Sequence, residues 1–559
     1  MTYMDRNEEL KKYITTTLTQ LKTDKARFEE DMKETCSFLR HRTKDPHSPV
    51  TEIPIYNTAP IDAVNTCIHG IAGYLLSPSI RWFKYIVHGK NFEKGDQLSG
   101  AEDWLEDVTD IQYMLYGNSR FYANTQDALK DSLITGTSYE MQTDALADKK
   151  KIIFDCFSPF ECYIAENSTG EVDTFFREYT MTARQAYDRF GEKLPQEIKR
   201  FLEELENPYT ECTFVHAIFP RKDHVPGVAA ATKKKYASVH YSSIGDTIID
   251  ESGFDEFPLA IHRWRKVSGT PYGVGLAMDY LPEIKRLNDL QKQYNIAVQF
   301  QASPMLQAPE QLRNRYIYRP GVVNYAPSNA GKPEVVTNQL NIQYLGAQIT
   351  ELEQKLQRLL YADLFNVLMR QERQRTAYEV EELKGEGLIL LSAIIGNMQN
   401  EKLVPLVLRT FHIMYKTGLL PPPPVELLKA SSNGQIDIEL DGPLAQRMKA
   451  YHKTNGLEQG LAAISAALQI FPNSIVNFDG DEYLRQLATA KGVPQSIIRE
   501  IPEVKKIQAE QARMQQEAAQ QQQMLAQSEM LKNMGYDASN AMQAGAEAPT
   551  SPGLMGGVV

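Results

Sequence analysis

The sequence predicts an α+β protein that is mainly helical. Runs of β-branched and aromatic residues, separated by turn signals, occupy much of residues 138–264 and are typical of strands. Apolar residues then recur at three- and four-residue steps along two arms, 281–302 and 343–364, which is the period of a helix. From residue 376 onward the pattern is helical throughout, up to a small and polar terminus.

The N-terminal part is predicted to consist of helices and one strand. Residues 1–43 form a charged helix whose apolar face consists of Leu10, Ile14, Leu18 and Leu21. Because lysines and glutamates surround that face, we expect a solvated surface helix. A second helix follows the capping segment Asn57–Thr58 with Pro60 at its start, and it ends at Ser77-Pro78. A strand-like run follows at 81–87, and further helices are expected at about 101–116 and 119–135.

A strand-rich region begins after Gly136. Its expected strands lie near 138–142, 151–157, 172–179, 213–219, 237–241 and 259–264, and helices at 183–190 and 196–205 interrupt them. Together with the preceding helices, these segments predict an α+β body of about 260 residues, which is a large single domain or two small ones.

The two arms are predicted to pack beside each other or beside neighbouring helices. The apolar positions of the first arm are Leu281, Ile284 and Leu287. The second arm alternates steps of four and three residues, as helices do that pack along a seam. Its seam consists of Leu345, Ile349, Leu352, Leu356 and Leu359. Between the arms, residues 303–342 are rich in proline and glycine with short β-like runs, which predicts a small module at the tip of the pair.

Three arginines follow the second arm, at Arg370, Arg373 and Arg375. Thr376 and Glu379 then have the spacing of a capping box, so a new helix is expected to start there. The arginines therefore precede a helix start. From the residues alone they are either a solvated charged segment or a contact for DNA.

The remainder of the chain is predicted to be helical in stages. A long helix continues to about residue 416, with a kink near Pro405, and the prolines of 421–424 then break it. A helical module follows from 443 to about residue 500. The Gln-rich stretch 508–527 is compatible with a continuing helix, whereas 535–559 is small, polar and expected to be disordered.

Length and charge limit the possible functions. The 559 residues predict roughly three to four domains. The net charge of −11 argues against tight nonspecific binding of nucleic acid by the whole chain. The charge is unevenly distributed, because residues 281–375 contain twelve lysines and arginines against eight aspartates and glutamates, which leaves the rest of the chain at −15. The positive surplus therefore belongs to the arms, their tip and the arginine segment.

The sequence indicates no cofactor, metal site or membrane span. The N-terminus lacks an apolar signal segment, and the longest nearly uncharged apolar run, 387–398, is shorter than the roughly 20 residues of a membrane span, so we expect a soluble intracellular protein. Five cysteines are an odd number, which favours reduced thiols. Cys156 and Cys162 have no second ligand pair at zinc spacing, so buried small side chains are the preferred interpretation.

The motifs of common enzymes are also missing. The chain contains no GxxxxGK[ST], GxSxG or HExxH sequence. Residues 269–275 form a glycine-rich loop before a helix, a pattern that can bind phosphate through free main-chain N–H groups. Without the lysine of a P-loop, hinge geometry is the preferred interpretation of this loop.

Three local segments, taken in their order, resemble one known family. They are Leu75-Leu76-Ser77-Pro78 followed by Trp82-Phe83, Tyr272-Gly273 before Tyr280-Leu281, and Arg375-Thr376-Ala377-Tyr378-Glu379-Val380. They are similar to the early Leu-x-x-Pro…Trp motif, the entry to the stem, and the Arg-Thr-Ala-x-Glu-Val motif of the portal, or head-to-tail connector, proteins of short-tailed bacteriophages. The resemblance covers most of residues 35–500.

The resemblance implies a portal fold assembled as a dodecameric ring around a DNA channel, at one vertex of the virion capsid and assembled in the host cytoplasm. The implied parts are a wing (1–280), two stem helices (281–302 and 343–364), a small α/β clip (303–342), a tunnel loop (365–375), a long wing helix (376–420), a helical crown (421–500) and a C-terminal Gln-rich helix, barrel or disordered tail (501–559).

The resemblance also implies partners and contact residues. Double-stranded DNA passes through the channel without sequence readout, the terminase and later the tail adaptor dock on the clip, and major capsid and scaffolding proteins surround the ring. The implied DNA contacts are three stacked rings made by Arg370, Arg373 and Arg375. The clip residues expected to contact acidic partners, or equally to form salt bridges between subunits, are Arg313, Arg315 and Arg319.

Two alternative functions stay open at this point. One is a structural or scaffold protein of the virion that has no DNA channel and whose arms only oligomerise. The other, less favoured, is a nucleotide-binding enzyme that uses the loop at 269–275. A ring with a central hole would distinguish the portal from the first, and measurable nucleotide affinity would be required by the second.

Overall fold

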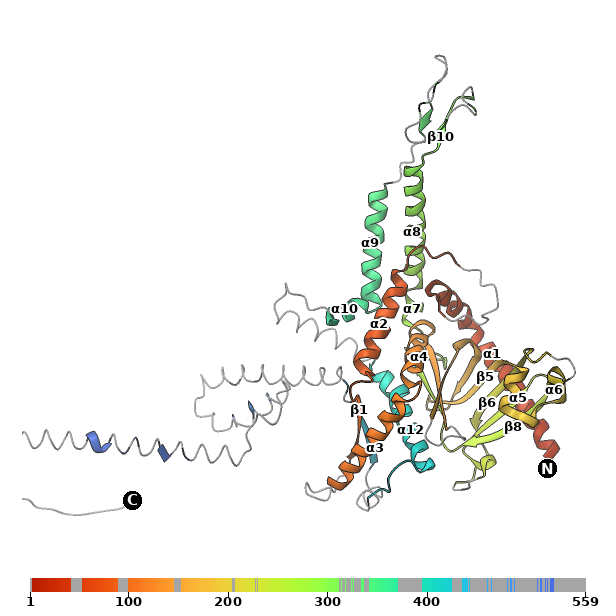
Figure 1. Ribbon diagram of the computed structural model, residues 1–559, viewed down its shortest axis with the longest axis vertical. Coiled ribbons are helices and arrows are strands. Elements are labelled where there is room, and N and C mark those ends of the chain that lie inside the picture. Colours follow the sequence, from red (N-terminus) through yellow and green to blue (C-terminus); the bar gives the residue numbers. More distant parts are fainter. Residues whose placement is uncertain are drawn as a thin grey trace, which may run out of the picture. The chain divides into compact units, whose positions relative to one another are not determined.

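The chain divides into two compact units, residues 1–449 and 450–559. The computed structural model (Figure 1) describes residues 3–41, 53–88, 99–144, 152–203, 207–310 except 227 and 229, 341–369, 395–424 and 435–440, with scattered positions in 313–335 and 442–526. Helices and strands both contribute to the first unit, and the α+β class is confirmed. The described positions of the second unit are helical.

The elements of the first unit follow one another along the chain with short connections. The helices are α1 (Tyr3–Leu39), α2 (Ala59–Leu75), α3 (Ser99–Gly117), α4 (Phe121–Thr135), α5 (Ala183–Phe190), α6 (Gln196–Glu203), α7 (Leu276–Asp279), α8 (Leu281–Ala302), α9 (Ile342–Leu359), α10 (Ala362–Met369) and α12 (Val404–Thr417), which a π-helical turn (Gln399–Leu403) precedes. The strands are β1 (Phe83–His88), β2 (Thr137–Asp144), β3 (Ile152–Phe157), β4 (Cys162–Glu166), β5 (Val172–Thr182), β6 (Glu211–Pro220), β7 (Tyr236–Ser242), β8 (Thr247–Phe254), β9 (Leu259–Arg263), β10 (Leu306–Gln307), β11 (Glu334–Val335) and β12 (Gln435–Leu440).

A five-stranded antiparallel sheet, in the order β4-β5-β6-β7-β8, forms one part of the body, and α1 covers one of its faces (Figure 1). Ile14, Leu18 and Leu21 of α1 are buried in one cluster with strand residues such as Phe176 and Val215. The expectation of a solvated surface helix is therefore wrong. The apolar face that the sequence shows is used to cover a sheet, which contributes roughly 1.5–3 kcal/mol for each large aliphatic side chain removed from water.

A three-stranded antiparallel sheet, in the order β3-β2-β9, packs against the other face of the first sheet. Tyr139 and Ile261 of the small sheet share a buried cluster with Phe175 and Ile218 of the large one. The largest buried cluster lies beyond the small sheet and joins α2, α3, α4, α9 and α12 around aromatic residues such as Trp82. The strands β4 and β8 were not predicted, because their sequences lack a clear alternation between turn signals.

A third pairing corrects the prediction for the second half of the chain. β12 pairs with β1 in an antiparallel ladder that joins Phe83 to Leu440 and His88 to Gln435. The prediction that the chain is helical throughout after residue 376 is therefore wrong at 435–440. Ile436, Ile438 and Leu440 alternate with polar residues, which is the two-residue period of a strand.

Among the described helices, none is both long and apolar enough to span a bilayer. The predicted capping box at Thr376 and Glu379 lies outside the described residues. The irregularity expected near Pro405 is present as the π-helical turn that directly precedes α12.

Candidate functional site

The two predicted arms form α8 and α9, which lie side by side and run in opposite directions (Figure 1). Two contacts fix this arrangement. Near one end, Lys355 Nζ of α9 is 2.9 Å from Glu283 Oε1 of α8. Near the other end, Gly346 of α9 faces the ring of Tyr294 of α8. Consecutive residues of the pair therefore form one two-helix stem, with residues 303–341 at its far end.

The predicted seam is buried within the single chain, with one exception. The buried residues are Leu281, Ile284, Leu287, Leu345, Ile349, Leu352 and Leu356. Leu359 is only half-buried, because α9 ends there and Leu360, with no exposed surface, takes the inner position. Tyr361 has a φ of 57°, which breaks the helix before α10 begins. The stem helix therefore ends earlier than the predicted residue 364.

An extended segment before α2 holds the two stem helices together. The side-chain amide of Asn57 donates to Gln291 Oε1 of α8 at 3.1 Å and to Glu353 Oε1 of α9 at 2.7 Å. The main-chain N–H of Tyr56 donates to Asn288 Oδ1, and Asn288 Nδ2 donates to the carbonyl of Pro54. The sequence indicated only a helix start at this position, because hydrogen bonds over more than 230 residues leave no local signal.

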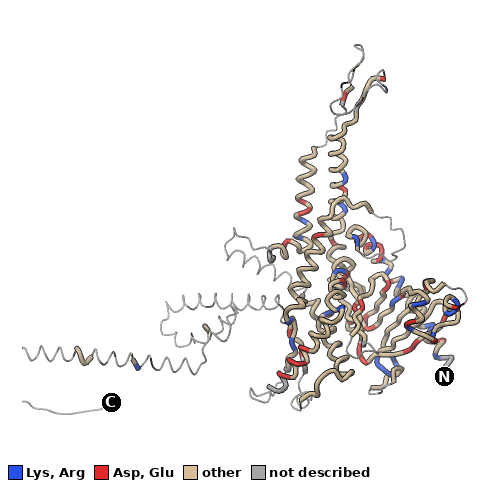
Figure 2. The backbone as a smooth tube through the Cα atoms, viewed as in Figure 1, with Lys and Arg blue, Asp and Glu red and all other residues tan. Residues whose placement is uncertain are grey.

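The distal half of the stem is uncharged and exposes apolar side chains. Residues 293–302 of α8 and 342–350 of α9 contain no lysine, arginine, aspartate or glutamate (Figure 2). Ile296 is 40 % exposed, Val298 is 38 % exposed and Tyr344 is 62 % exposed. Between the first two, Ala297 is buried. Adjacent residues of a helix point about 100° apart, so Ile296 and Val298 flank the buried side of α8 on either hand.

Charges at the base of the stem are largely paired. Besides the Lys355–Glu283 pair, Lys285 Nζ is 2.5 Å from Glu34 Oε1 of α1. The positive surplus of residues 281–375 therefore depends on the arginines at the tip and after the stem. Of these, Arg313 lies in an exposed turn whose main-chain N–H donates to Glu310. The other predicted contact residues, Arg315, Arg319, Arg370, Arg373 and Arg375, lie outside the described residues.

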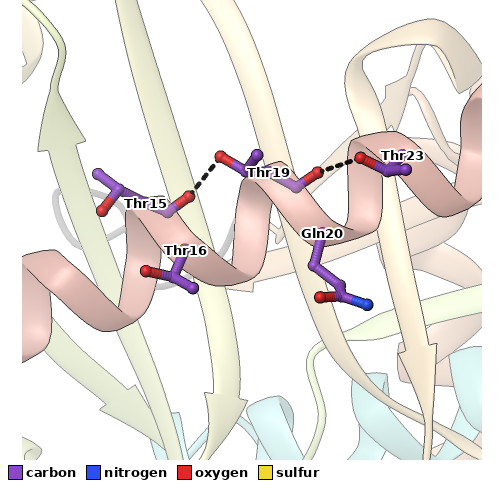
Figure 3. A pocket seen from close by; sticks show the side chains of 5 residues that line it. All are labelled: Thr15, Thr16, Thr19, Gln20 and Thr23. Carbon is purple, nitrogen blue, oxygen red and sulfur yellow. Dashed lines mark hydrogen bonds between the residues drawn. The ribbon is translucent and has the colours of Figure 1, made fainter.

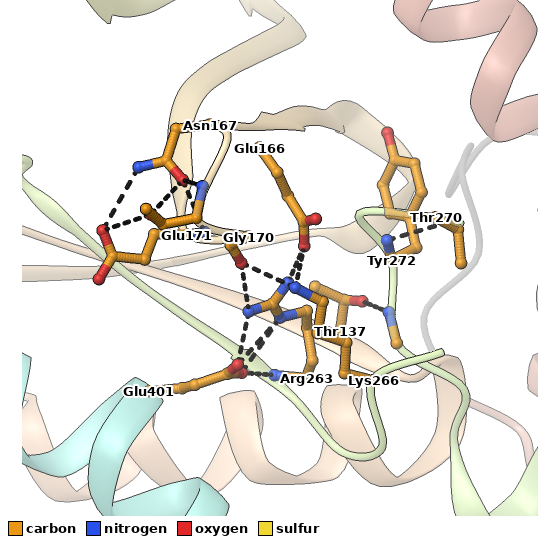
Figure 4. A network of polar contacts seen from close by, with 12 residues as sticks. Thr137, Glu166, Asn167, Gly170, Glu171, Arg263, Lys266, Thr270, Tyr272 and Glu401 are labelled. Atoms are coloured by element: carbon orange, nitrogen blue, oxygen red, sulfur yellow. Dashed lines mark hydrogen bonds and ion pairs between the residues drawn. The ribbon is translucent and has the colours of Figure 1, made fainter. Parts of the chain in front are cut away.

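The glycine-rich loop before the stem packs against the body rather than presenting free N–H groups (Figure 4). The main-chain N–H of Gly273 donates to Thr137 Oγ1, and that of Val274 donates to the carbonyl of Arg265. A Cβ atom at Gly273 would be 2.4 Å from the carbonyl oxygen of Gly136, and one at Gly275 would be 2.6 Å from that of Leu133. The glycines are required for close backbone packing at the stem entry, which agrees with the hinge interpretation.

Gly273→Ala is expected to destabilise the protein by roughly 2–3 kcal/mol, because the added methyl group overlaps backbone that cannot move aside easily. Urea unfolding followed by circular dichroism measures this change. The matched control is Gly73→Ala in α2, where a Cβ meets nothing within 4 Å and alanine is expected to stabilise the helix by up to about 1 kcal/mol. Equal stability of the two variants would contradict the close packing.

The described surface offers no enclosed site on the stem. A hollow on α1 is lined by Thr15, Thr16, Thr19, Gln20 and Thr23 of that helix alone (Figure 3). The hydroxyl of Thr19 donates to the carbonyl of Thr15, and that of Thr23 to the carbonyl of Thr19, so these hydroxyls are used within the helix. The hollow therefore has no charged or convergent group that would bind a ligand.

Three buried histidines are structural rather than reactive. The rings of His216 and His240 stack at 4.1 Å in the five-stranded sheet, and burial holds the pKa of His216 well below its usual range and lowers the pKa of His240 to about 3. Burial likewise lowers the pKa of His262 to about 3. The thiols of Cys67 and Cys162 are free, and burial raises the pKa of Cys67 to about 12. These groups are held neutral, as interior packing residues are.

Comparison with known proteins identifies the family. A family model described as bacteriophage head to tail connecting protein matches residues 11–498. The chain is 27 % identical over 514 residues to the "Probable portal protein" of Bordetella phage BPP-1, which covers 88 % of this chain and 90 % of the relative. It is also 27 % identical over 514 residues to the "Portal protein" of Salmonella phage epsilon15, covering 89 % and 90 %. The chain therefore belongs to the family of bacteriophage head to tail connecting proteins.

Proposed function

We propose that this chain is the subunit of a portal ring at one vertex of a phage capsid, through which double-stranded DNA is packaged and later ejected. The observation that best supports the proposal is the two-helix stem, whose distal half is uncharged and has apolar side chains on both sides of its buried seam. A ring subunit needs contact surfaces on two sides. The family match and the two portal relatives support the same function.

The charge pattern suits a duct for sliding DNA. Each phosphate neutralised by a lysine or arginine adds an increment of affinity that depends on salt, so a dense basic wall would hold the duplex instead of letting it move. The described stem has paired lysines at its base and no charge in its distal half. In this proposal Arg370, Arg373 and Arg375 supply sparse positive rings in a tunnel loop after the stem.

The remaining parts take the roles that the portal architecture gives them. Twelve copies form the ring, with residues 1–280 and the long helix as the wing and residues 303–342 as the clip. The clip docks the terminase and then the tail adaptor, and Arg313, Arg315 and Arg319 are its candidate contacts. Met305 and Tyr325 add apolar surface there, since they are 55 % and 88 % exposed. Capsid and scaffolding proteins contact the outside of the ring.

The subunit contact of the stem can be tested with charge substitutions. In the double variant Ile296→Glu and Val298→Glu, carboxylates from neighbouring copies would face one another, so we expect a folded protein that no longer assembles. Sedimentation velocity measures assembly, and circular dichroism confirms the fold.

The matched control is Met114→Glu, a single substitution on α3 of the body at a side chain that is 59 % exposed. This variant should assemble like the unmodified protein. Normal assembly of the stem variant, or equal loss in the control, would contradict the assignment of the distal stem to the subunit contact.

A further inference from the structure

A π-helical turn interrupts the long helix directly before a proline. It spans Gln399–Leu403, and the main-chain N–H of Val404 donates to the carbonyl of Gln399, five residues back. Pro405 has no N–H, and its ring crowds the carbonyl of Glu401, so a regular α-helical turn is disfavoured here. Turns of this kind are rare and frequently occur at functional positions.

The widened turn pairs with the edge of the three-stranded sheet at Arg263. The main-chain N–H of Arg263 donates to Glu401 Oε2 at 2.9 Å, and its carbonyl accepts a hydrogen bond from the side-chain amide of Asn397. Its guanidinium, whose side chain is 6 % exposed, donates to Glu401 Oε1 through Nε at 3.1 Å and Nη2 at 2.5 Å. Two helix side chains thus take the place of a neighbouring strand on the edge of β9.

The same arginine holds the turn between β4 and β5 (Figure 4). Its Nη1 contacts the carboxylate of Glu166, and its Nη2 lies 3.4 Å from the carbonyl oxygen of Gly170. Three residues later, Lys266 pairs with the same carboxylate at 2.8 Å and donates to the same carbonyl. Arg263 therefore lies where the long helix, the large sheet and the start of the stem-entry loop, residues 264–275, meet.

The next residue of the π turn is anchored as well. Lys402 Nζ is 2.7 Å from Glu140 Oε2 of β2, and neither side chain has exposed surface. Adjacent residues of a regular helix point about 100° apart, so two consecutive anchors fix the rotation of the turn relative to the sheet. Arg263 and Glu140 together hold this register.

We propose that Arg263 is a joint that couples the long helix to the stem. It is a positioning residue: it keeps the π turn in register and makes the turn and the stem-entry loop move together. If Glu401 were released, the turn could narrow to α-helical geometry, which would rotate the preceding residues by about 100° and shift them by about 1.5 Å. Those residues continue towards the arginine segment, so in the ring proposed above the joint links the position of the stem to that segment.

Hydrogen exchange of the purified full-length protein tests the joint. Glu401→Gln keeps the shape of the side chain and removes its charge. The expected result is about tenfold faster exchange of the main-chain N–H groups of Gly273 and Val274, which lie in the stem-entry loop, because local opening there depends on the lost charged contact.

The matched control removes another ion pair of the same helix. Arg409 Nη1 is 2.7 Å from Glu256 Oε1, and Glu256→Gln should accelerate exchange around residues 255–257 without changing the stem-entry loop. The proposal is overturned if the loop is unchanged in Glu401→Gln, if the control changes it equally, or if the buried helix α4 accelerates by the same factor, which would show global loss of stability. The joint can be tested in the isolated subunit, so its failure is distinguishable from failure of the channel.

Discussion

Lys402→Ala is expected to lower the free energy of unfolding by roughly 3–5 kcal/mol, because it leaves an unpaired carboxylate in the interior. Both members of the Lys402–Glu140 pair are fully buried at 2.7 Å, and Thr125 donates to the other oxygen of Glu140 at 2.8 Å. Urea unfolding of the purified protein measures the change.

Two further variants separate this effect from a general loss of contacts. The double variant Lys402→Met and Glu140→Leu removes both charges and should recover most of the lost stability. Arg81→Ala removes an exposed partner of Glu106 and Asp110 and should cost less than about 1 kcal/mol. If Lys402→Ala cost no more than Arg81→Ala, the pair would not be a buried anchor.

Replacing Arg370, Arg373 and Arg375 together by alanine is expected to abolish or strongly reduce DNA packaging or retention while leaving assembly intact. In the proposed ring these side chains contact phosphates as sparse positive charges and read no bases. Packaged DNA per particle is the quantity to measure, beside the sedimentation of the purified variant.

Replacing the same three arginines by lysine is the control for charge. A phosphate contact that depends on charge rather than on the planar guanidinium group should keep most of the packaging in the lysine variant. Unchanged packaging in the alanine variant would remove these residues from the mechanism. Loss in both variants would show that the loop needs arginine geometry and not charge alone.

Local patterns predicted much of the fold. The α+β class, the main helices and most strands follow from periods of 3.6 and 2 residues. The alternation of Leu345 with Ile349, Leu352 and Leu356 placed α9, because a seam that faces another helix must repeat at this step. Strand β12 was missed because it is short and lies in a stretch that the surrounding helical pattern dominated.

The stem entry shows why the rest could not be predicted. Arg263 and Glu401 are 138 residues apart, and nothing near either residue indicates the other. The same holds for Asn57, which bridges Gln291 and Glu353 across the stem. Burial of α1 was also underestimated, since an amphipathic face shows that a helix is covered on one side but not how much of it the partner encloses. The arginine contacts at 370–375 stay predictions.

Electron microscopy of the purified protein tests the central claim most directly. The account predicts closed rings with a central hole wide enough for duplex DNA, about 20 Å, in class averages viewed along the ring axis. In side views the paired helices of the stem would form the wall of that hole. Monomers, open filaments or solid particles without a hole would contradict the channel and favour a structural virion protein whose arms only oligomerise.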